Sequence, residues 1–259
     1  MQHEFALGVE GGGTKTEWVL LSLPRNIVIR RGSLPPANFK LITPDALERI
    51  LKLLPADVSH VGVYLAGCAT ELDRVRLRNI AQRNWPQAHV TAGSDRDSGF
   101  ATAFGDGDGI SVISGTGSAV TGRKAGKIEK AGGWGQLLGD TGGGYNIAVH
   151  GLRLALSSYD IEHDITPLGH KILRALSLNK LASLVDWATN ADKMSVARLA
   201  PVMFEAAAEG DVEMRVVIHG AANTLAEYSN AVAKRLGFDA PEVRLLGGLF
   251  LSYDVYAGY

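Results

Sequence analysis

The chain has 259 residues, of which 46% are hydrophobic and 20% are charged, and its formal net charge is −1. This balance is ordinary for a globular protein and gives no electrostatic reason to expect nucleic acid or a membrane surface as a partner. The single cysteine, Cys68, excludes an internal disulfide and any metal site built from several cysteines of one chain. Without a signal peptide or an apolar run of about 20 residues, the sequence predicts a cytoplasmic protein.

The first part of the chain predicts a hairpin meander that leads into alternating strands and helices. Strands are expected over 5–10, 15–22, 27–31, 58–66 and 88–92, and helices over 44–54, 71–83 and 95–104. Thr43 and Pro44 mark the start of the first helix, as its N-cap and its first helical residue.

The second part of the chain repeats this beginning. A glycine-rich segment, 105–109, is the best candidate for a linker. Strands are then expected over 110–114, 118–123 and 127–131, helices over 143–157, 166–176, 179–188, 195–209 and 211–236, and a last strand over 242–246. We therefore expect two lobes, 1–108 and 109–259, that share a topology rather than a repeated sequence.

The first hairpin carries the sequence GVEGGGTKT, residues 8–16. A Walker loop needs glycine directly before its lysine and a helix after it, but here Thr14 precedes Lys15 and a strand follows. A dinucleotide-binding fingerprint also requires a helix at this point. What remains is a hairpin whose backbone N–H groups and Thr14 hydroxyl bind phosphate oxygens. The alternative is a plain turn, although three consecutive glycines exceed what a tight hairpin needs.

The second lobe opens with the same arrangement. The sequence ISGTGS, residues 113–118, places a Gly/Thr turn between two apolar strands. One such turn is weak evidence, whereas two turns, each at the first hairpin of a lobe, indicate a pair of sites for one polyphosphate.

These turns, followed by GGWG at 132–135 and LGD at 138–140, resemble the N-acetylglucosamine kinase family. That family lies within the BadF/BadG/BcrA/BcrD ATPase group of the actin/hexokinase superfamily, and the resemblance extends from Gly8 to Phe250. It implies an α/β fold of two ribonuclease-H-like (actin-like ATPase) lobes with an interlobe cleft. It also implies a homodimeric, ATP- and Mg²⁺-dependent sugar kinase.

On the nucleotide side, the resemblance implies three turns and one metal-binding carboxylate. The implied ATP-binding residues are Gly11, Gly12, Gly13, Thr14, Lys15, Thr116, Gly117, Gly247 and Gly248. Glu10 stands where the superfamily usually has an aspartate, and its carboxylate is expected to orient Mg²⁺, directly or through water.

Asp95 is the candidate to accept the proton of the sugar hydroxyl, because phosphoryl transfer to an alcohol needs a positioned carboxylate. It follows a predicted strand and begins a helix, whose dipole is expected to keep it ionised. From sequence alone, a mere helix cap is an equally good interpretation, and the resemblance favours the catalytic one. Asp97, two residues on, should face elsewhere.

The acceptor side is less definite. Asp140 reads either as a cap for the following helix or as a ligand for sugar hydroxyls. The resemblance implies sugar contacts from Asn38, Asp95, Ser118, Gly133, Trp134 and Asp140. Composition alone would place Trp134 in the core. Ala119 stands where vertebrate-type enzymes have an asparagine, so recognition of the sugar's 2-substituent is left open.

The predicted function is phosphorylation of an amino sugar, N-acetylglucosamine or glucosamine, at its C6 hydroxyl. A non-catalytic ATP- and sugar-binding regulator on the same fold is the alternative. A third reading, the ATPase activator of a CoA dehydratase, is disfavoured because its subunits each supply two cysteines to an iron–sulfur cluster and this chain has one.

The end of the chain carries a separate expectation. Family members continue past the adenosine motif with a helix that packs on the first lobe, whereas this chain stops at Tyr259. The final family helix is therefore expected to be missing and to leave an apolar patch for a dimer partner to cover. The alternative is that the sequence is part of a longer protein.

Overall fold

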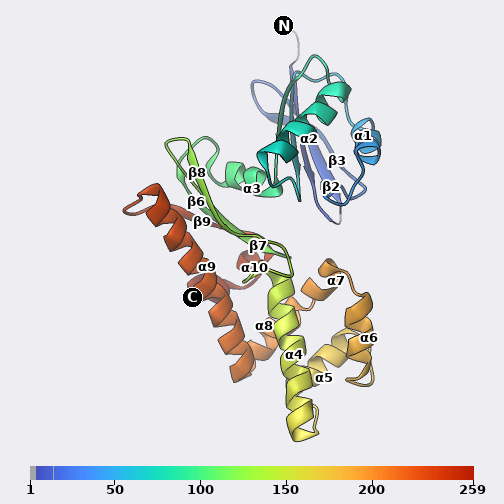
Figure 1. Ribbon diagram of the computed structural model, residues 1–259, viewed down its shortest axis with the longest axis vertical. Coiled ribbons are helices and arrows are strands. Elements are labelled where there is room, and N and C mark those ends of the chain that lie inside the picture. The colour runs from blue at the N-terminus through green and yellow to red at the C-terminus, as the bar shows by residue number, and fades with distance from the viewer. Residues whose placement is uncertain (1–3, 14) are drawn as a thin grey trace. The chain divides into compact units, whose positions relative to one another are not determined.

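The computed structural model describes residues 4–13 and 15–259, which form two compact units (Figure 1). The first unit ends at Thr102 and the second begins at Ala103. The division thus lies a few residues before the expected boundary between 108 and 109.

The first unit is built on a five-stranded sheet with strand order β3-β2-β1-β4-β5. Its elements are β1 (Phe5–Gly11), β2 (Thr16–Ser22), β3 (Ile27–Leu34), α1 (Pro44–Leu51), β4 (His60–Leu65), α2 (Glu71–Asn84), β5 (His89–Gly93) and α3 (Asp95–Phe104). β1 pairs antiparallel with β2 and parallel with β4, and β4 pairs parallel with β5. The carboxyl ends of β1, β4 and β5 therefore lie along one edge of the sheet, where ligands of α/β folds commonly bind.

The second unit is built on a four-stranded sheet with strand order β8-β7-β6-β9. Its strands are β6 (Gly109–Ser114), β7 (Ser118–Lys124), β8 (Lys127–Gly132) and β9 (Val243–Leu246). β6 pairs antiparallel with β7 and parallel with β9, as β1 does with β2 and β4. The predicted α/β fold with two related sheets is confirmed.

Helices fill the segment between β8 and β9. They are α4 (Gly144–Glu162), α5 (Pro167–Ala175), α6 (Ser183–Asn190), α7 (Lys193–Ala197), α8 (Ala200–Ala208) and α9 (Val212–Leu236), and α10 (Gly248–Ser252) and α11 (Asp254–Gly258) follow the last strand. α9 lies along β7 and β8 (Figure 1). A side chain at Gly122 of β7 would collide with Val232 and Leu236 of α9, so this glycine permits the close packing of helix on sheet.

One predicted helix is wrong in its extent. The pattern over 195–209 predicts a single helix, whereas the structure has two short helices, α7 and α8. Pro201 lies in the first turn of α8, where its missing N–H costs nothing, but it would interrupt a continuous helix. Asp192 begins α7 as its N-cap, with its Oδ1 accepting a hydrogen bond from Ser195 N at 2.6 Å.

The end of α3 belongs to the second unit because side chains of that unit hold it. Arg244 of β9 donates a hydrogen bond to the carbonyl of Ala103, and its guanidinium lies 4.9 Å from the centre of the Phe104 ring. Arg123 of β7 donates to the carbonyl of Gly105 at 2.7 Å. The glycine-rich segment after α3 is thus anchored on the second sheet.

No helix in the described part of the chain is both long enough and apolar enough to span a bilayer.

Candidate active site

The turn between β1 and β2 contains glycines of two kinds. Gly11 is glycine for a packing reason, because a Cβ there would lie 2.6 Å from Leu65 Cδ2 and 2.8 Å from the carbonyl oxygen of Ala37. Gly12 and Gly13 have open space around the Cβ position, and neither adopts a left-handed φ. Nothing in the described part of the chain explains why these two positions lack side chains, which fits a backbone that a ligand approaches.

Two other residues of this turn were predicted to bind ATP. Thr14 lies outside the described residues. Lys15 is exposed, and its Nζ lies 2.8 Å from Glu17 Oε1 on the next strand. Because such a surface pair contributes little to stability, the Lys15 side chain can leave Glu17 at small cost.

The turn between β6 and β7 rests on the start of α4. The N–H groups of Gly144 and Tyr145 donate to the carbonyls of Gly115 and Thr116, at 2.7 and 3.0 Å. The positive end of the α4 dipole therefore lies directly behind this turn, which favours a negatively charged ligand there. Gly115 has open space at its Cβ position, as Gly12 and Gly13 do.

The turn after β9 touches the turn after β6. Gly247 has a φ of +97°, and a Cβ there would collide with the carbonyl of Ser114, so the fold itself requires this glycine. Gly248 begins α10, and its Cβ position is open. Among the glycines predicted to bind ATP, packing against the described residues explains Gly11, Gly117 and Gly247, whereas Gly12, Gly13 and Gly248 have no such explanation among the described residues.

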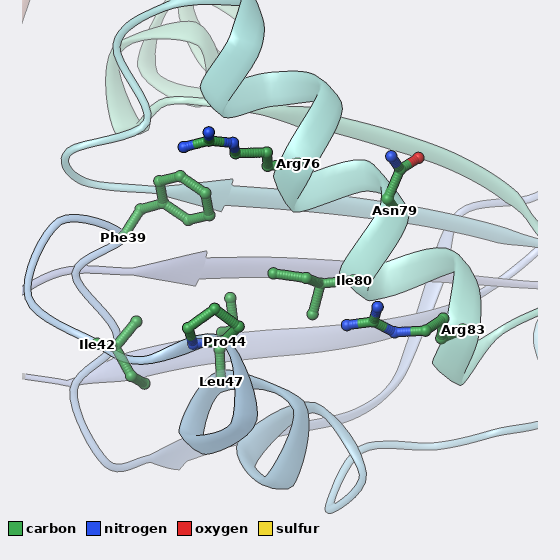
Figure 2. Close-up of a pocket in the computed structure, with 8 residues that line it drawn as sticks. All are labelled: Phe39, Ile42, Pro44, Leu47, Arg76, Asn79, Ile80 and Arg83. Carbon is green, nitrogen blue, oxygen red and sulfur yellow. The ribbon is translucent and has the colours of Figure 1, made fainter.

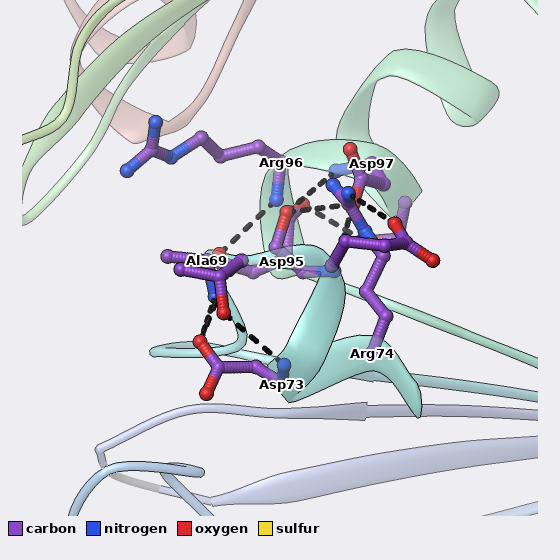
Figure 3. A network of polar contacts seen from close by, with 10 residues as sticks. Ala69, Asp73, Arg74, Asp95, Arg96 and Asp97 are labelled. Atoms are coloured by element: carbon purple, nitrogen blue, oxygen red, sulfur yellow. Dashed lines mark hydrogen bonds and ion pairs between the residues drawn. The ribbon is translucent and has the colours of Figure 1, made fainter. Parts of the chain in front are cut away.

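The start of α3 is capped by residues other than Asp95 (Figure 3). The carboxylate of Asp97 accepts hydrogen bonds from the N–H and the hydroxyl of Ser94, both at 2.9 Å. The hydroxyl of Ser94 in turn accepts one from Asp97 N at 3.3 Å. This reciprocal pair is a capping box, and Arg74 of α2 holds it through an ion pair with Asp97 at 2.9 Å. The interpretation of Asp95 as the helix cap is therefore wrong.

Asp95 lies beside the carboxyl end of β1. Ser98, one turn along α3, has its hydroxyl 2.5 Å from Glu10 Oε2 and 3.0 Å from the carbonyl of Asp95. Asp95 Oδ1 accepts a hydrogen bond from the N–H of Arg96 at 3.1 Å. Ser98 thus links the carboxylate of Glu10, the predicted metal-binding residue, to the backbone of Asp95, the predicted catalytic residue.

The surroundings of the Asp95 carboxyl shift its pKa in the direction opposite to the effect expected of the helix dipole. Desolvation by the surrounding protein raises the pKa of the Asp95 carboxyl and outweighs the opposing effect of Arg96. The residue is exposed, and solvent screens this effect. A raised pKa makes a carboxylate a better proton acceptor.

Asn38 lies in the loop between β3 and α1, next to the end of β1. Its Oδ1 accepts a hydrogen bond from Lys40 N at 3.0 Å. A Cβ at Gly67 would lie 2.6 Å from the same oxygen, so a glycine at this position leaves room for the Asn38 side chain. Lys40 ties this loop to α2 through Asp73, with Nζ to Oδ1 at 2.8 Å. Asp73 is buried and also accepts a hydrogen bond from Thr70 N at 3.0 Å.

We expect Asp73→Asn to lower the free energy of unfolding by about 1.5 kcal/mol. This value is the lower end of the usual range for a hydrogen bond to a charged group, and we choose it because Lys40 is half exposed and solvent screens the ion pair. Lys40 and the N–H of Thr70 hold the pKa of Asp73 below its usual value near 3.9. Its stabilisation is therefore present above about pH 4 and is lost as the pH falls. Urea unfolding of both proteins from pH 7 to pH 3 measures this, and a constant difference across that range would contradict it.

Asp140 connects three parts of the second unit. It is 5% exposed and has a φ of +55°. Its Oδ1 accepts a hydrogen bond from Gly135 N at 3.2 Å, and its Oδ2 lies 2.6 Å from Lys193 Nζ. A Cβ at Gly117 would lie 2.5 Å from that Oδ2, so the glycine of the second turn makes room for the carboxylate. The N-cap of α4 is Gly143, and the interpretation of Asp140 as a cap is wrong.

The other residues predicted on the acceptor side lie around Asp140. Ser118 is buried, and its hydroxyl donates to the carbonyl of Thr141 at 2.7 Å. Gly133 has a φ of +67° and leads into Trp134, whose side chain is 79% exposed. The prediction from composition that Trp134 lies in the core is wrong, because the residue is mostly exposed and buries little apolar surface. Leu137 and Leu138 are equally exposed, so this loop presents an apolar surface.

The first unit also contains a groove (Figure 2). It has a volume of about 370 Å³ between α1 and α2. Its lining residues are Phe39, Ile42, Pro44, Leu47, Arg76, Asn79, Ile80 and Arg83. None of them was predicted to bind a ligand. Cys68, in the same unit, is fully buried, and burial raises its pKa to about 11, as expected of an unreactive core thiol.

Comparisons with known proteins agree on the family. An N-acetylmuramic acid/N-acetylglucosamine kinase from Clostridium acetobutylicum is 27% identical, over 93% of this chain and 83% of that protein. An N-acetyl-D-glucosamine kinase from Dictyostelium discoideum is 28% identical, with the same coverage. A candidate N-acetylglucosamine kinase from Chromobacterium violaceum has a similar solved structure, with a TM-score of 0.77 at 24% identity, over 98% of this chain and 90% of that one.

The sequence model of the BadF/BadG/BcrA/BcrD ATPase family matches residues 7–258. This match spans nearly the whole chain, from the first strand to the last helix. The chain belongs to the BadF/BadG/BcrA/BcrD ATPase family.

Proposed function

We propose that this protein is an ATP-dependent kinase that phosphorylates an amino sugar, N-acetylglucosamine or glucosamine, at its C6 hydroxyl. The observation that carries the proposal is the start of α3, where Ser94 and Asp97 form the cap and Asp95 is left for another purpose. The curated relatives, both named as amino-sugar kinases, support the same class of reaction.

The roles in this reaction are divided between the nucleotide and the sugar. Gly12, Gly13 and Gly248, whose Cβ positions are open, let the backbone approach ATP, and Asp95 accepts the proton of the attacking hydroxyl. Asn38, Ser118, Gly133, Trp134 and Asp140 bind the sugar. We also propose that the enzyme works as a homodimer in the cytoplasm, where ATP is available.

Glu10 is the residue that would hold Mg²⁺. Its exposed carboxylate fits a metal that protein kinases and related enzymes bind through one or two carboxylates, waters and substrate phosphates. Among the described residues, no group of three or more acidic, histidine or cysteine side chains is placed to bind a metal ion. Waters and the phosphates of the nucleotide would therefore supply the other ligands of Mg²⁺. When bound, Mg²⁺ neutralises charge on the phosphates.

The proposal is tested by ADP release from ATP and Mg²⁺ with a series of hexoses, amino sugars and their N-acetyl forms. We expect N-acetylglucosamine or glucosamine to raise the rate well above the sugar-free rate, with one phosphorylated sugar formed per ADP. A protein that binds both ligands without this increase would instead be the non-catalytic regulator.

We expect Trp134→Ala to raise the KM for the sugar about tenfold, which corresponds to about 1.4 kcal/mol and to the usual worth of an aromatic contact. Because the side chain is 79% exposed, the unfolding free energy should change by less than about 0.5 kcal/mol. Initial rates and thermal unfolding of the same preparations provide both values. A destabilised variant with an unchanged KM would mean that Trp134 has a structural role instead.

A further inference from the structure

We propose that Lys193 is a positioning residue for Asp140 and, through it, for the loop that carries Gly133 and Trp134. This inference rests on the proposed function, because it assumes that Asp140 and this loop bind the sugar. Lys193 lies on α7, 53 residues from Asp140 in the sequence, and belongs to none of the motifs described above.

The carboxylate of Asp140 is shared between two partners. Its Oδ2 binds the ammonium of Lys193 at 2.6 Å, and its Oδ1 binds the N–H of Gly135 at 3.2 Å. The Gly135 carbonyl then accepts a hydrogen bond from Gly139 N at 2.8 Å, which closes the loop over 135–139. The chain of contacts thus runs from Lys193 through Asp140 to the residue directly after Trp134.

Asp140 needs a cation for a physical reason. The residue is 5% exposed, and a carboxylate removed from water is costly unless a charged partner and hydrogen bonds compensate. Its φ of +55° is uncommon for a residue with a side chain and persists only where the surroundings fix it. Lys193 supplies the charge, and the space beside Gly117 admits both groups, since a Cβ there would lie 3.1 Å from Lys193 Nζ.

Lys193 is itself held in place by its helix. Asp192 caps α7 through Ser195 N. The next residue, Met194, has its sulfur 3.7 Å from Thr116 Oγ1 on the second turn. α7 is thus fixed both at its N-cap and where Met194 contacts Thr116, and this holds the ammonium group of Lys193 in a defined position beside Asp140.

The test is a set of variants in the full-length protein, with the KM for the sugar and the dissociation constant for ADP measured separately. We expect Lys193→Met to raise the sugar KM about tenfold, the size expected for loss of a charge-assisted contact, and to change ADP affinity less than about threefold. Lys193→Arg, which keeps the cation, should recover most of the loss. Lys171→Met is the matched control, because Lys171 pairs with Glu205 and Glu209 in the same unit, and it should leave the sugar KM unchanged.

A double-mutant cycle separates positioning from direct contact with ligand. If Lys193 acts through Asp140, Lys193→Met should have no further effect on the sugar KM in an Asp140→Asn background. Multiplied effects, or a loss of ADP affinity alone, would overturn the inference. An unchanged sugar KM in the single variant would overturn it as well, whereas a wild-type protein that no sugar activates would instead overturn the proposed function.

Discussion

Asp95→Asn should slow turnover by about 10²-fold or more, the usual scale for loss of a proton acceptor, while the protein remains folded and still binds ATP. Asparagine offers an oxygen in the place of Asp95 Oδ1 for the N–H of Arg96, and the capping box of Ser94 and Asp97 is untouched. The loss should therefore appear in kcat and not in the melting temperature. Near-normal turnover would show that Asp95 is not the proton acceptor.

Asp97→Asn is the matched control for this change, since it removes a carboxylate from the same turn of α3. It should lower stability, because it weakens the cap and breaks the ion pair with Arg74. The wild-type pH profile offers a second check. Because desolvation raises the pKa of Asp95, kcat/KM should begin to fall with acid above pH 3.9, the ordinary value for aspartate. Asp95→Asn should abolish this acidic limb.

Gly12→Ala should weaken ATP binding and leave stability unchanged, whereas Gly11→Ala should lower stability, although the two residues are adjacent. A methyl group at position 12 meets no atom within 4 Å, so the unfolding free energy should change by less than about 0.5 kcal/mol. If phosphate oxygens approach this backbone, the methyl group costs a charge-assisted hydrogen bond, and ATP affinity should fall about tenfold or more.

At position 11 the methyl group would press on Leu65 and on the backbone of Ala37, and such overpacking costs about 1–3 kcal/mol of stability. Chemical unfolding and nucleotide titration of both variants provide the comparison. Should Gly12→Ala bind ATP as tightly as the wild type, the first turn would not contact the phosphates through Gly12.

The sequence predicts the order of the strands and helices well because their hydrophobic patterns and caps are local. Thr43 and Pro44, for example, begin α1 as predicted. The cap of α3 also has a local signal in the sequence, because Ser94 is followed three residues later by Asp97. The boundary between α7 and α8 has a local signal as well, because Pro201 is a residue type that favours the first turn of a helix.

Other features of the candidate site could not be predicted from one sequence. The two kinds of glycine look alike in the sequence, and only the position of Leu65 and Ala37 separates Gly11 from Gly12. The partner of Asp140 comes from a helix far along the chain, and no motif marks it. The raised pKa of Asp95 depends on how much protein surrounds the carboxyl, and the position of Asp95 at the start of a helix does not reveal this.

The arrangement at the start of α3 also has an evolutionary consequence. If Asp95 is the proton acceptor, as proposed, selection for folding acts there on Ser94 and Asp97, whereas selection for turnover acts on Asp95 between them. On that proposal, a single-nucleotide change from an aspartate to an asparagine codon would slow phosphoryl transfer without unfolding the protein. Descendants that became sensors should keep the serine and the second aspartate and lose the first, a signature that can be sought in genomes.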